Sequence, residues 1–463
     1  MKHMAISALG RSGLLAVAAA VAVALPPISA DDRFADLDRI AEAELAGAKI
    51  PGALVAVVEK DKIVYAKAFG VANVESGQPM TPDMIFPIAS LTKMFTAIAA
   101  ASLAEDGTLD LQAPIGRYVP GLPPGLASVT AHQLLSHDAG LRDNSPTAGP
   151  IYDDNVIGEQ ARGYDDGIFF TEPGKVFSYS NQGFNLVGYV LERVAGAPYS
   201  ELIGRRLLGP LGMTHSTYRL SEAVKSPLSQ LHLISPGRPV AVARPYPIAQ
   251  WPACGMFSTL GDLGRFAIAF MNDGWIDGRQ AMSASAIKRV ATPYVPVHSE
   301  LADGQYGYGL VTLDYRGVRV VQHGGILVGA ASRLVMAPAR RIAVITFANA
   351  PIQLGRTLQK ALEIMLPLKA LPPGARPLPL SPSEADEYVG RYSQGTVQEV
   401  VRSENSIGLR TSGSTVVPMT RIGPDRFVLG AAGVDPAEVA FVRAADGHVA
   451  YLHMRLRAYR RIQ

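Results

Sequence analysis

The chain has 463 residues, a formal net charge of +3, 48% hydrophobic residues and 18% charged residues. This length is enough for one large domain and a smaller one, each with its own core. The near-balanced charge, without a basic stripe that alternates with aromatic residues, argues against nucleic acid as a partner. Cys254 is the one cysteine, so an intramolecular disulfide is excluded, and we expect a small buried side chain there.

The first 30 residues are typical of an export signal rather than of a folded domain. Lys2 and Arg11 supply positive charge, and no polar side chain interrupts the run from Gly13 to Leu25. Such a run is too short to span a bilayer but fits the core of a signal peptide. We expect cleavage after Ala30 and a periplasmic or secreted protein with no stable membrane span. An uncleaved membrane anchor is the alternative.

Residues 31–366 show alternating helical and strand periodicity, and we take them as one domain. The expected elements are a helix over 34–47, strands over 53–58 and 63–69, a helix from Ser90 to near Gly107, a short helix closed by Gly140, a helix after Asn181, a helix capped by Ser258 or Thr259, strands over 318–322, 331–336 and 342–347, and a helix over 354–366. Residues 142–172 are rich in Asp, Asn, Gly and Pro, and we expect a loop over the functional site there.

A domain boundary is expected at residues 367–383, where six prolines favour an extended, semi-rigid linker. Residues 384–463 contain several short β-prone runs separated by Gly, Asp and Ser, which is the pattern of a small antiparallel sheet or barrel. Within it, the basic cluster from Arg455 to Arg461 suits a strand with one solvated face.

A Ser-x-x-Lys pair, Ser90 and Lys93, opens an alanine-rich helical run. Residues three apart lie on one face of a helix, so the hydroxyl and the ammonium can meet. A serine hydroxyl needs a base or a cation to become a nucleophile, and a partly buried lysine can supply that help. Ser-x-x-Lys marks the β-lactamases and penicillin-binding proteins, but by itself the pair also occurs by chance.

Two further polar clusters follow, Tyr179-Ser-Asn181 and His323-Gly-Gly325. Tyr179 could act as a base only beside cations, because a phenol pKa is normally about 10. Asn181 would orient Lys93 and hold a substrate carbonyl. Gly324 and Gly325 would let a strand approach the substrate, so that the N–H of Ile326 could pair with the N–H of Ser90 as an oxyanion hole.

Each cluster also has an ordinary structural explanation. Ser90 could be only a helix cap, Lys93 a solvated first-turn residue, Tyr179 a core aromatic, and the glycine pair a β-turn. His132 and His137 are five apart, off the spacing for a shared metal on one helix, so we interpret both as structural. The sequence contains no His-Glu-x-x-His and no Gly-x-Ser-x-Gly, which excludes the zincin and α/β-hydrolase classes.

The order and context of these clusters resemble the serine β-lactamase-related family, which holds class C β-lactamases, serine D-Ala-D-Ala carboxypeptidases, family VIII esterases and D-amino-acid peptidases. The resemblance covers roughly residues 35–365, and the tail resembles, more loosely, the small β-barrel modules appended to some members. The segments that carry it are Ile88–Ala97, Leu134–Leu141, Pro173–Asn181, Leu207–Met213, Gly255–Thr259 with Asp262, Tyr306–Gly309 and His323–Gly329.

The resemblance implies an α/β (α+β) fold: an antiparallel sheet flanked by helices, with an all-helical subdomain inserted between about residues 105 and 260. It also implies catalytic roles for Ser90, Lys93 and Tyr179, and substrate binding by Asn181 and His323. Class C β-lactamases typically have Lys-Thr-Gly at the third motif. Here His323 and Gly324 replace the cation and the hydroxyl, which should weaken the grip on a substrate carboxylate.

We therefore expect an exported serine hydrolase that forms an acyl-enzyme on Ser90 and needs no metal or organic cofactor. Carboxylic esters or small peptide amides, including those with D-residues, are the first choice of substrate. A D-Ala-D-Ala carboxypeptidase or a weak β-lactamase is the close alternative, and a penicillin-binding sensor without turnover is an alternative of another class. The physiological substrate and the oligomeric state are not determined by the sequence.

Overall fold

A computed structural model describes residues 32–143, 156–243, 250–299, 304–371, 376–403, 406–411, 413–430 and 437–462. The expected signal peptide therefore lies outside the described residues. In the part of the chain that is described, eight strands form one antiparallel sheet in the order β2-β1-β14-β13-β12-β11-β10-β9. Their bounds are Gly52–Glu59 (β1), Lys62–Gly70 (β2), Val295–Pro296 (β9), Gln305–Tyr306 (β10), Val311–Tyr315 (β11), Val318–Leu327 (β12), Ala330–Ala337 (β13) and Ile342–Ala348 (β14).

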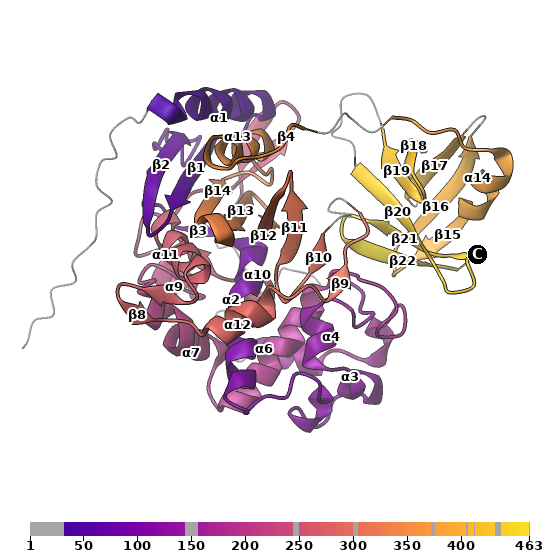
Figure 1. Ribbon diagram of the computed structural model, residues 1–463, viewed down its shortest axis with the longest axis horizontal. Coiled ribbons are helices and arrows are strands. Elements are labelled where there is room, and N and C mark those ends of the chain that lie inside the picture. The colour runs from indigo at the N-terminus through magenta and orange to yellow at the C-terminus, as the bar shows by residue number, and fades with distance from the viewer. Residues whose placement is uncertain are drawn as a thin grey trace, which may run out of the picture.

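The middle of this sheet is buried on both faces. Strands β1 and β14 are almost entirely buried, which explains why they read as unbroken apolar runs. One face packs against α1 (Ala35–Ala48) and α13 (Gly355–Met365), as Figure 1 shows. The other packs against α11 (Leu260–Met271) and the core that surrounds α2 (Thr92–Glu105). The expected antiparallel sheet flanked by helices is confirmed.

The segment between β2 and β9 holds most of the remaining helices. These are α3 (Pro124–Ser128), α4 (Ala131–Leu135), α5 (Val156–Arg162), α6 (Asn181–Ala195), α7 (Tyr199–Ile203), α8 (Gly209–Leu211), α9 (Leu220–Ala223), α10 (Trp251–Cys254) and α12 (Ala284–Val290). The insertion is not purely helical, because β4 (His232–Ser235) and β5 (Arg238–Ala241) form a hairpin within it. Residues 142–172 are not all loop as expected, because helix α5 lies among them; residues 144–155 are outside the described residues.

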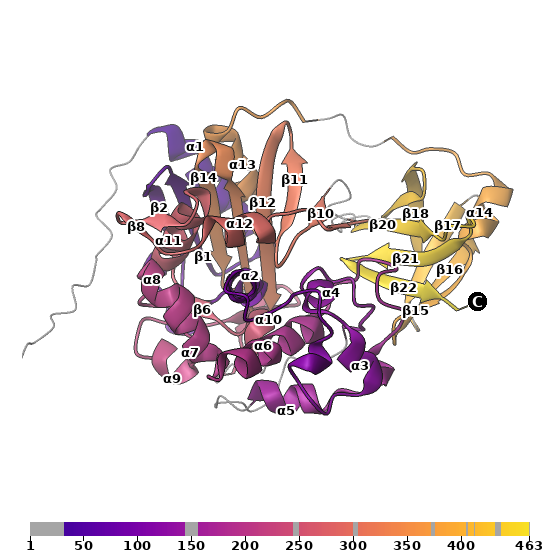
Figure 2. The ribbon, with the colours of Figure 1, turned by 60° about the horizontal axis from the view of Figure 1, so that its bottom comes forward.

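The C-terminal region forms a closed antiparallel barrel, beginning with the short helix α14 (Pro382–Tyr388). Its strands are β15 (Gly390–Ser393), β16 (Val397–Ser403), β17 (Ser406–Thr411), β18 (Val417–Gly423), β19 (Arg426–Leu429), β20 (Ala437–Arg443), β21 (Val449–Met454) and β22 (Arg457–Arg461). The barrel has its own core, centred on Tyr388, Phe427 and Phe441. Figures 1 and 2 show it beside the β9–β10 edge of the sheet. Across the described residues, no helix is long and apolar enough to cross a membrane.

Candidate active site

Ser90 lies in a 3₁₀ turn, Ala89–Leu91, that leads directly into α2. Ala89 has φ of 50°, a left-handed backbone conformation that costs a residue with a side chain of order 1–3 kcal/mol. The turn is held from both sides: Thr92 Oγ1 donates to the carbonyl of Ala89 at 2.6 Å, and Ser332 Oγ of β13 donates to the carbonyl of Ile88 at 2.6 Å. Ser90 is therefore presented on a strained turn that is braced against the interior strands β12 and β13 of the sheet.

Lys93, one turn further on, is fully buried, with 0% of its surface exposed. Its Nζ is 3.3 Å from Ser90 Oγ, 2.6 Å from Asn181 Oδ1 and 2.9 Å from the carbonyl oxygen of Ala253 in α10. Burial lowers the pKa of Lys93 from 10.5 to about 7, so the amine is partly neutral near neutral pH. Two of its three partners can only accept hydrogen bonds. A neutral amine would donate to those two and turn its lone pair to Ser90.

Tyr179 lies over the same amine. Lys93 Nζ is 4.7 Å from the centre of its ring, and the hydroxyl shares a hydrogen bond with Ser90. Burial is the largest influence on this phenol and raises its pKa well above the ordinary value, although the bond to Ser90 acts in the opposite direction. The Tyr179 hydroxyl therefore keeps its proton at neutral pH, and between Lys93 and Tyr179 the lysine is the better base.

The third motif lies inside β12 rather than in a turn between two strands. Residues 318–322 and 323–325 form one continuous strand that pairs with β13, with Gly325 opposite Ser332 and Ile326 opposite Ala331. A Cβ on Gly325 would be 2.6 Å from the carbonyl oxygen of Ile88 and 2.8 Å from Ala89 Cβ. Glycine at this position lets β12 press directly against the Ser90 turn, with Ile326 next along the strand.

His323 is buried, and burial lowers its pKa to about 3. Its hydrogen bonds fix the tautomer: Nδ1 must donate to the carbonyl of Gly324 at 2.6 Å, so Nε2 accepts from Tyr306 Oη at 3.2 Å. His137 continues the chain, because its Nδ1 accepts from the N–H of Ser180 and its Nε2 therefore donates to Tyr306 Oη at 3.1 Å. Both imidazoles are neutral, and His323 brings no cation to the site.

The structure brings together Ser90, Lys93, Tyr179 and Asn181, and packs the strand of His323 to Ile326 against the same turn. Sequence reasoning missed two charged residues that belong with them, Asp143 and Arg457. Asp143 Oδ1 accepts from the backbone N–H of Asn181 at 3.0 Å and from its Nδ2 at 3.2 Å. Arg457 of β22 contacts Asp143 and lies over the Tyr179 ring, with its guanidinium carbon 5.4 Å from the ring centre.

The expectation that Arg455 to Arg461 line a solvated strand face is therefore wrong for Arg457, since the turn into β22 points it at the larger domain. His132 and His137 bond to Tyr308 and Tyr306, as expected of structural histidines. Within the described residues no group of three or more His, Cys, Asp or Glu side chains could hold a metal ion.

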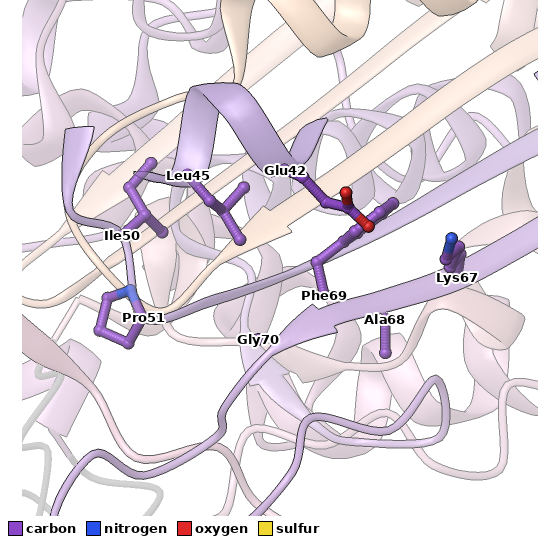
Figure 3. Close-up of a pocket in the computed structure, with 8 residues that line it drawn as sticks. All are labelled: Glu42, Leu45, Ile50, Pro51, Lys67, Ala68, Phe69 and Gly70. Atoms are coloured by element: carbon purple, nitrogen blue, oxygen red, sulfur yellow. The ribbon is translucent and has the colours of Figure 1, made fainter. Parts of the chain in front are cut away.

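A hollow of about 330 Å³ lies elsewhere on the molecule, between α1 and β2. Figure 3 shows its lining, which includes Glu42 and Lys67 at one side and Pro51 at the other. None of the residues around Ser90 contributes to it, so this hollow is no part of the site.

The fold is that of the β-lactamase-type serine hydrolases. The protein-family profile described as Beta-lactamase matches residues 37–365, so the chain belongs to the beta-lactamase family. The resemblance noted from the sequence motifs is confirmed. Among curated relatives, a D-aminopeptidase of Cereibacter sphaeroides is 26% identical over 398 residues, covering 83% of this chain and 70% of the relative.

Among solved structures, that of SurE is similar with a TM-score of 0.74 at 24% identity, covering 93% of this chain and 99% of that chain. Because 93% of this chain is covered, the similarity to SurE includes residues of the C-terminal barrel. A class C beta-lactamase has a TM-score of 0.62 at 20% identity, covering 75% of this chain and 99% of that chain. At these identities the likeness shows the fold alone.

Proposed function

We propose that the protein is a serine hydrolase that works through an acyl-enzyme on Ser90, with Lys93 as the general base. The observation that carries this proposal is the setting of the Lys93 amine. It is fully buried, 3.3 Å from Ser90 Oγ, and its other two partners are oxygens that can only accept. Because burial lowers its pKa to about 7, the amine can take the hydroxyl proton near neutral pH.

In the proposed reaction, Ser90 Oγ attacks the substrate carbonyl carbon while its proton passes to Lys93. The backbone N–H groups of Ser90 and Ile326 would stabilise the oxyanion, which the close approach of β12 to the Ser90 turn supports. The Tyr179 hydroxyl, which holds its proton, would carry the proton from Lys93 to the leaving alcohol or amine. A water molecule would then attack the acyl-enzyme carbonyl and give its proton to Lys93. The proton would return to Ser90 Oγ as the carboxylic acid product leaves.

For the substrate, we propose carboxylic esters and small peptide amides, including D-amino-acid amides. A neutral His323 beside Gly324 and Gly325 offers neither a cation nor a hydroxyl to a substrate carboxylate, which argues against efficient β-lactam hydrolysis. The D-aminopeptidase relative supports the amide side of this choice. We further propose that the protein is exported, from the pattern of residues 1–30, and that it uses no cofactor.

The direct test compares wild type with Ser90→Ala and with Ser102→Ala, which replaces a serine of α2, the helix that follows the Ser90 turn. Wild type should hydrolyse p-nitrophenyl esters or D-aminoacyl anilides faster than nitrocefin and D-Ala-D-Ala peptides. Ester hydrolysis should rise with pH through about 7, as Lys93 loses its proton. A fluorophosphonate probe should label wild type and Ser102→Ala.

Ser90→Ala should lose both hydrolysis and labelling, and full hydrolysis in this variant would refute the mechanism. Intact-mass spectrometry of wild type with a penicillin distinguishes an enzyme from a penicillin-binding sensor without turnover. A transient adduct is expected of an enzyme, whereas an adduct that is stable for hours would indicate a sensor.

A further inference from the structure

The turn between β21 and β22 of the barrel reaches the segment that carries Tyr179 and Asn181. The backbone N–H of Tyr179 donates to the carbonyl of Leu456 at 2.9 Å, and the N–H of Ala458 donates to Ser178 Oγ at 3.2 Å. Figure 2 shows β21 and β22 directed at the region of α4 and α6. Three consecutive barrel residues are thus aligned along this segment, and the middle one is Arg457.

Arg457 connects the barrel to Lys93 through two intermediates. Its Nε donates to Asp143 Oδ2 at 2.9 Å, and its Nη2 makes a second, shorter contact with the same carboxylate. Asp143 in turn accepts two hydrogen bonds from Asn181, whose Oδ1 accepts from Lys93 at 2.6 Å. The Asp143 side chain is only 6% exposed, whereas that of Arg457 is 31% exposed, so the carboxylate is the less screened of the two charges.

We propose that Arg457 of the barrel is a positioning residue for the active site: it holds Asp143, which orients the Asn181 amide toward Lys93. This inference rests on the proposed function of Ser90 and Lys93. Asp143 holds both the backbone N–H and the side-chain Nδ2 of Asn181, and this fixes the direction in which Oδ1 of the same side chain points. The Lys93 amine that donates to this Oδ1 is then held with its lone pair toward Ser90.

The pair also sets the charge that Lys93 faces. Asp143 raises the pKa of Lys93 and Arg457 lowers it, so the two charges oppose each other at this amine. The other titratable groups that act on the amine are the buried thiol of Cys254, the Tyr179 phenol, and the neutral imidazoles of His137 and His323. Removing Arg457 would leave a negative charge near Lys93, and removing the charge of Asp143 would leave a positive one.

The two single variants should therefore move the acidic limb of the kcat/KM profile in opposite directions. In Arg457→Met the limb should move up by about one pH unit, which by itself makes activity about fivefold lower at pH 7; near pH 9 that part disappears, and the activity that is still missing measures the lost positioning of Asn181. In Asp143→Asn the limb should move down. The double variant should return it to near the wild-type position, because both charges are gone. The readout is p-nitrophenyl ester hydrolysis between pH 5 and 10.

Arg460→Met is the matched control, since it removes an exposed positive charge from the same strand and should leave the profile unchanged. Equal profiles for wild type and Arg457→Met, or limbs that move the same way in both single variants, would overturn the inference. If Arg457→Met fails to fold, Arg457→Gln keeps a donor without the charge and must show the same upward movement. Fluorophosphonate labelling of wild type but not of Ser90→Ala tests the proposed function separately, whatever Arg457 does.

Discussion

Lys93 carries an energetic conflict that only function explains. A fully buried ammonium loses its hydration, and a pKa lowered from 10.5 to about 7 corresponds to at most about 5 kcal/mol of unfavourable burial, at about 1.4 kcal/mol per tenfold change in proton affinity. Three oxygen partners offset part of this cost. Perturbed groups of this kind gather where a protein needs a base that is active near neutral pH.

Replacing Lys93 by methionine should therefore abolish hydrolysis and yet stabilise the fold at low pH. Between pH about 7 and 10.5 the unfolded chain binds more protons at this residue than the folded chain does, so wild-type stability rises with pH across that window. At pH 6 both states are protonated and the folded state carries the whole cost. Lys93→Met should raise the free energy of unfolding there by about 1–3 kcal/mol, allowing for the oxygens left without a donor.

Urea unfolding of both proteins at pH 6 and pH 10 measures this difference. The gain should shrink toward zero at pH 10, where wild type no longer buries a charge. Lys225→Met, which removes an exposed lysine, should change stability by less than about 0.5 kcal/mol at either pH. Equal destabilisation by Lys93→Met at both pH values would contradict the account of Lys93 as a costly buried cation.

At the scale of elements, the site depends on how closely β12 packs against the turn that carries Ser90. Gly324 and Gly325 are adjacent in β12 but face different neighbours, because successive residues of a strand point to opposite faces. A Cβ on Gly325 would meet Ser332 Oγ at 2.5 Å and the carbonyl of Ile88 at 2.6 Å. A Cβ on Gly324 would instead meet the end of the flexible Gln353 side chain, at 2.4 Å.

Gly325→Ala should thus move the strand away from Ser90, whereas Gly324→Ala should need only a side-chain shift. A displacement of about 1 Å can cost on the order of 100-fold in rate, so we expect that loss in kcat/KM for Gly325→Ala. Gly324→Ala, the matched control, should lose less than about tenfold. Ester hydrolysis and fluorophosphonate labelling rates measure both. A larger loss for Gly324→Ala would show that the approach of β12 at Gly325 is not what positions the site.

The sequence predicted the sheet, its covering helices and the motif residues because each depends on local patterning. Ser90 and Lys93 are only three residues apart in the sequence. The apolar runs of β1 and β14 predict that these strands are buried. Asp143 and Arg457 were missed because they are 314 positions apart, and only the docking of the barrel brings them together. Nothing in an Asp-rich loop or in an arginine-rich strand indicates such a pair.

At the scale of the whole molecule, the barrel is joined to the larger domain close to the site. Thr171 Oγ1 is 2.7 Å from Tyr451 Oη, and Ser299 Oγ is 2.7 Å from Nδ1 of the fully buried His453. Ala458 packs with Phe170 and Val176 in a small apolar cluster between the two domains. If the barrel helps to orient Asn181, activity should follow the folding of the barrel as well as that of the larger domain.

Phe427→Ala tests this dependence, because Phe427 is fully buried in the barrel core against Tyr388 and Phe441. The truncation should cost the barrel about 3–5 kcal/mol and lower its melting temperature by at least about 10 °C. Both tryptophans of the chain, Trp251 and Trp275, lie in the larger domain, so their fluorescence reports that domain alone.

On heating, Phe427→Ala should lose ester hydrolysis at the barrel transition, seen by far-UV circular dichroism, before the tryptophan fluorescence changes. The half-buried neighbour Val428 supplies the control, and Val428→Ala should keep activity up to a higher temperature. Phe427→Leu, a milder change, should fall between the two variants. Hydrolysis that persists until the tryptophan transition, after the barrel has melted, would mean that the barrel is dispensable for positioning the site.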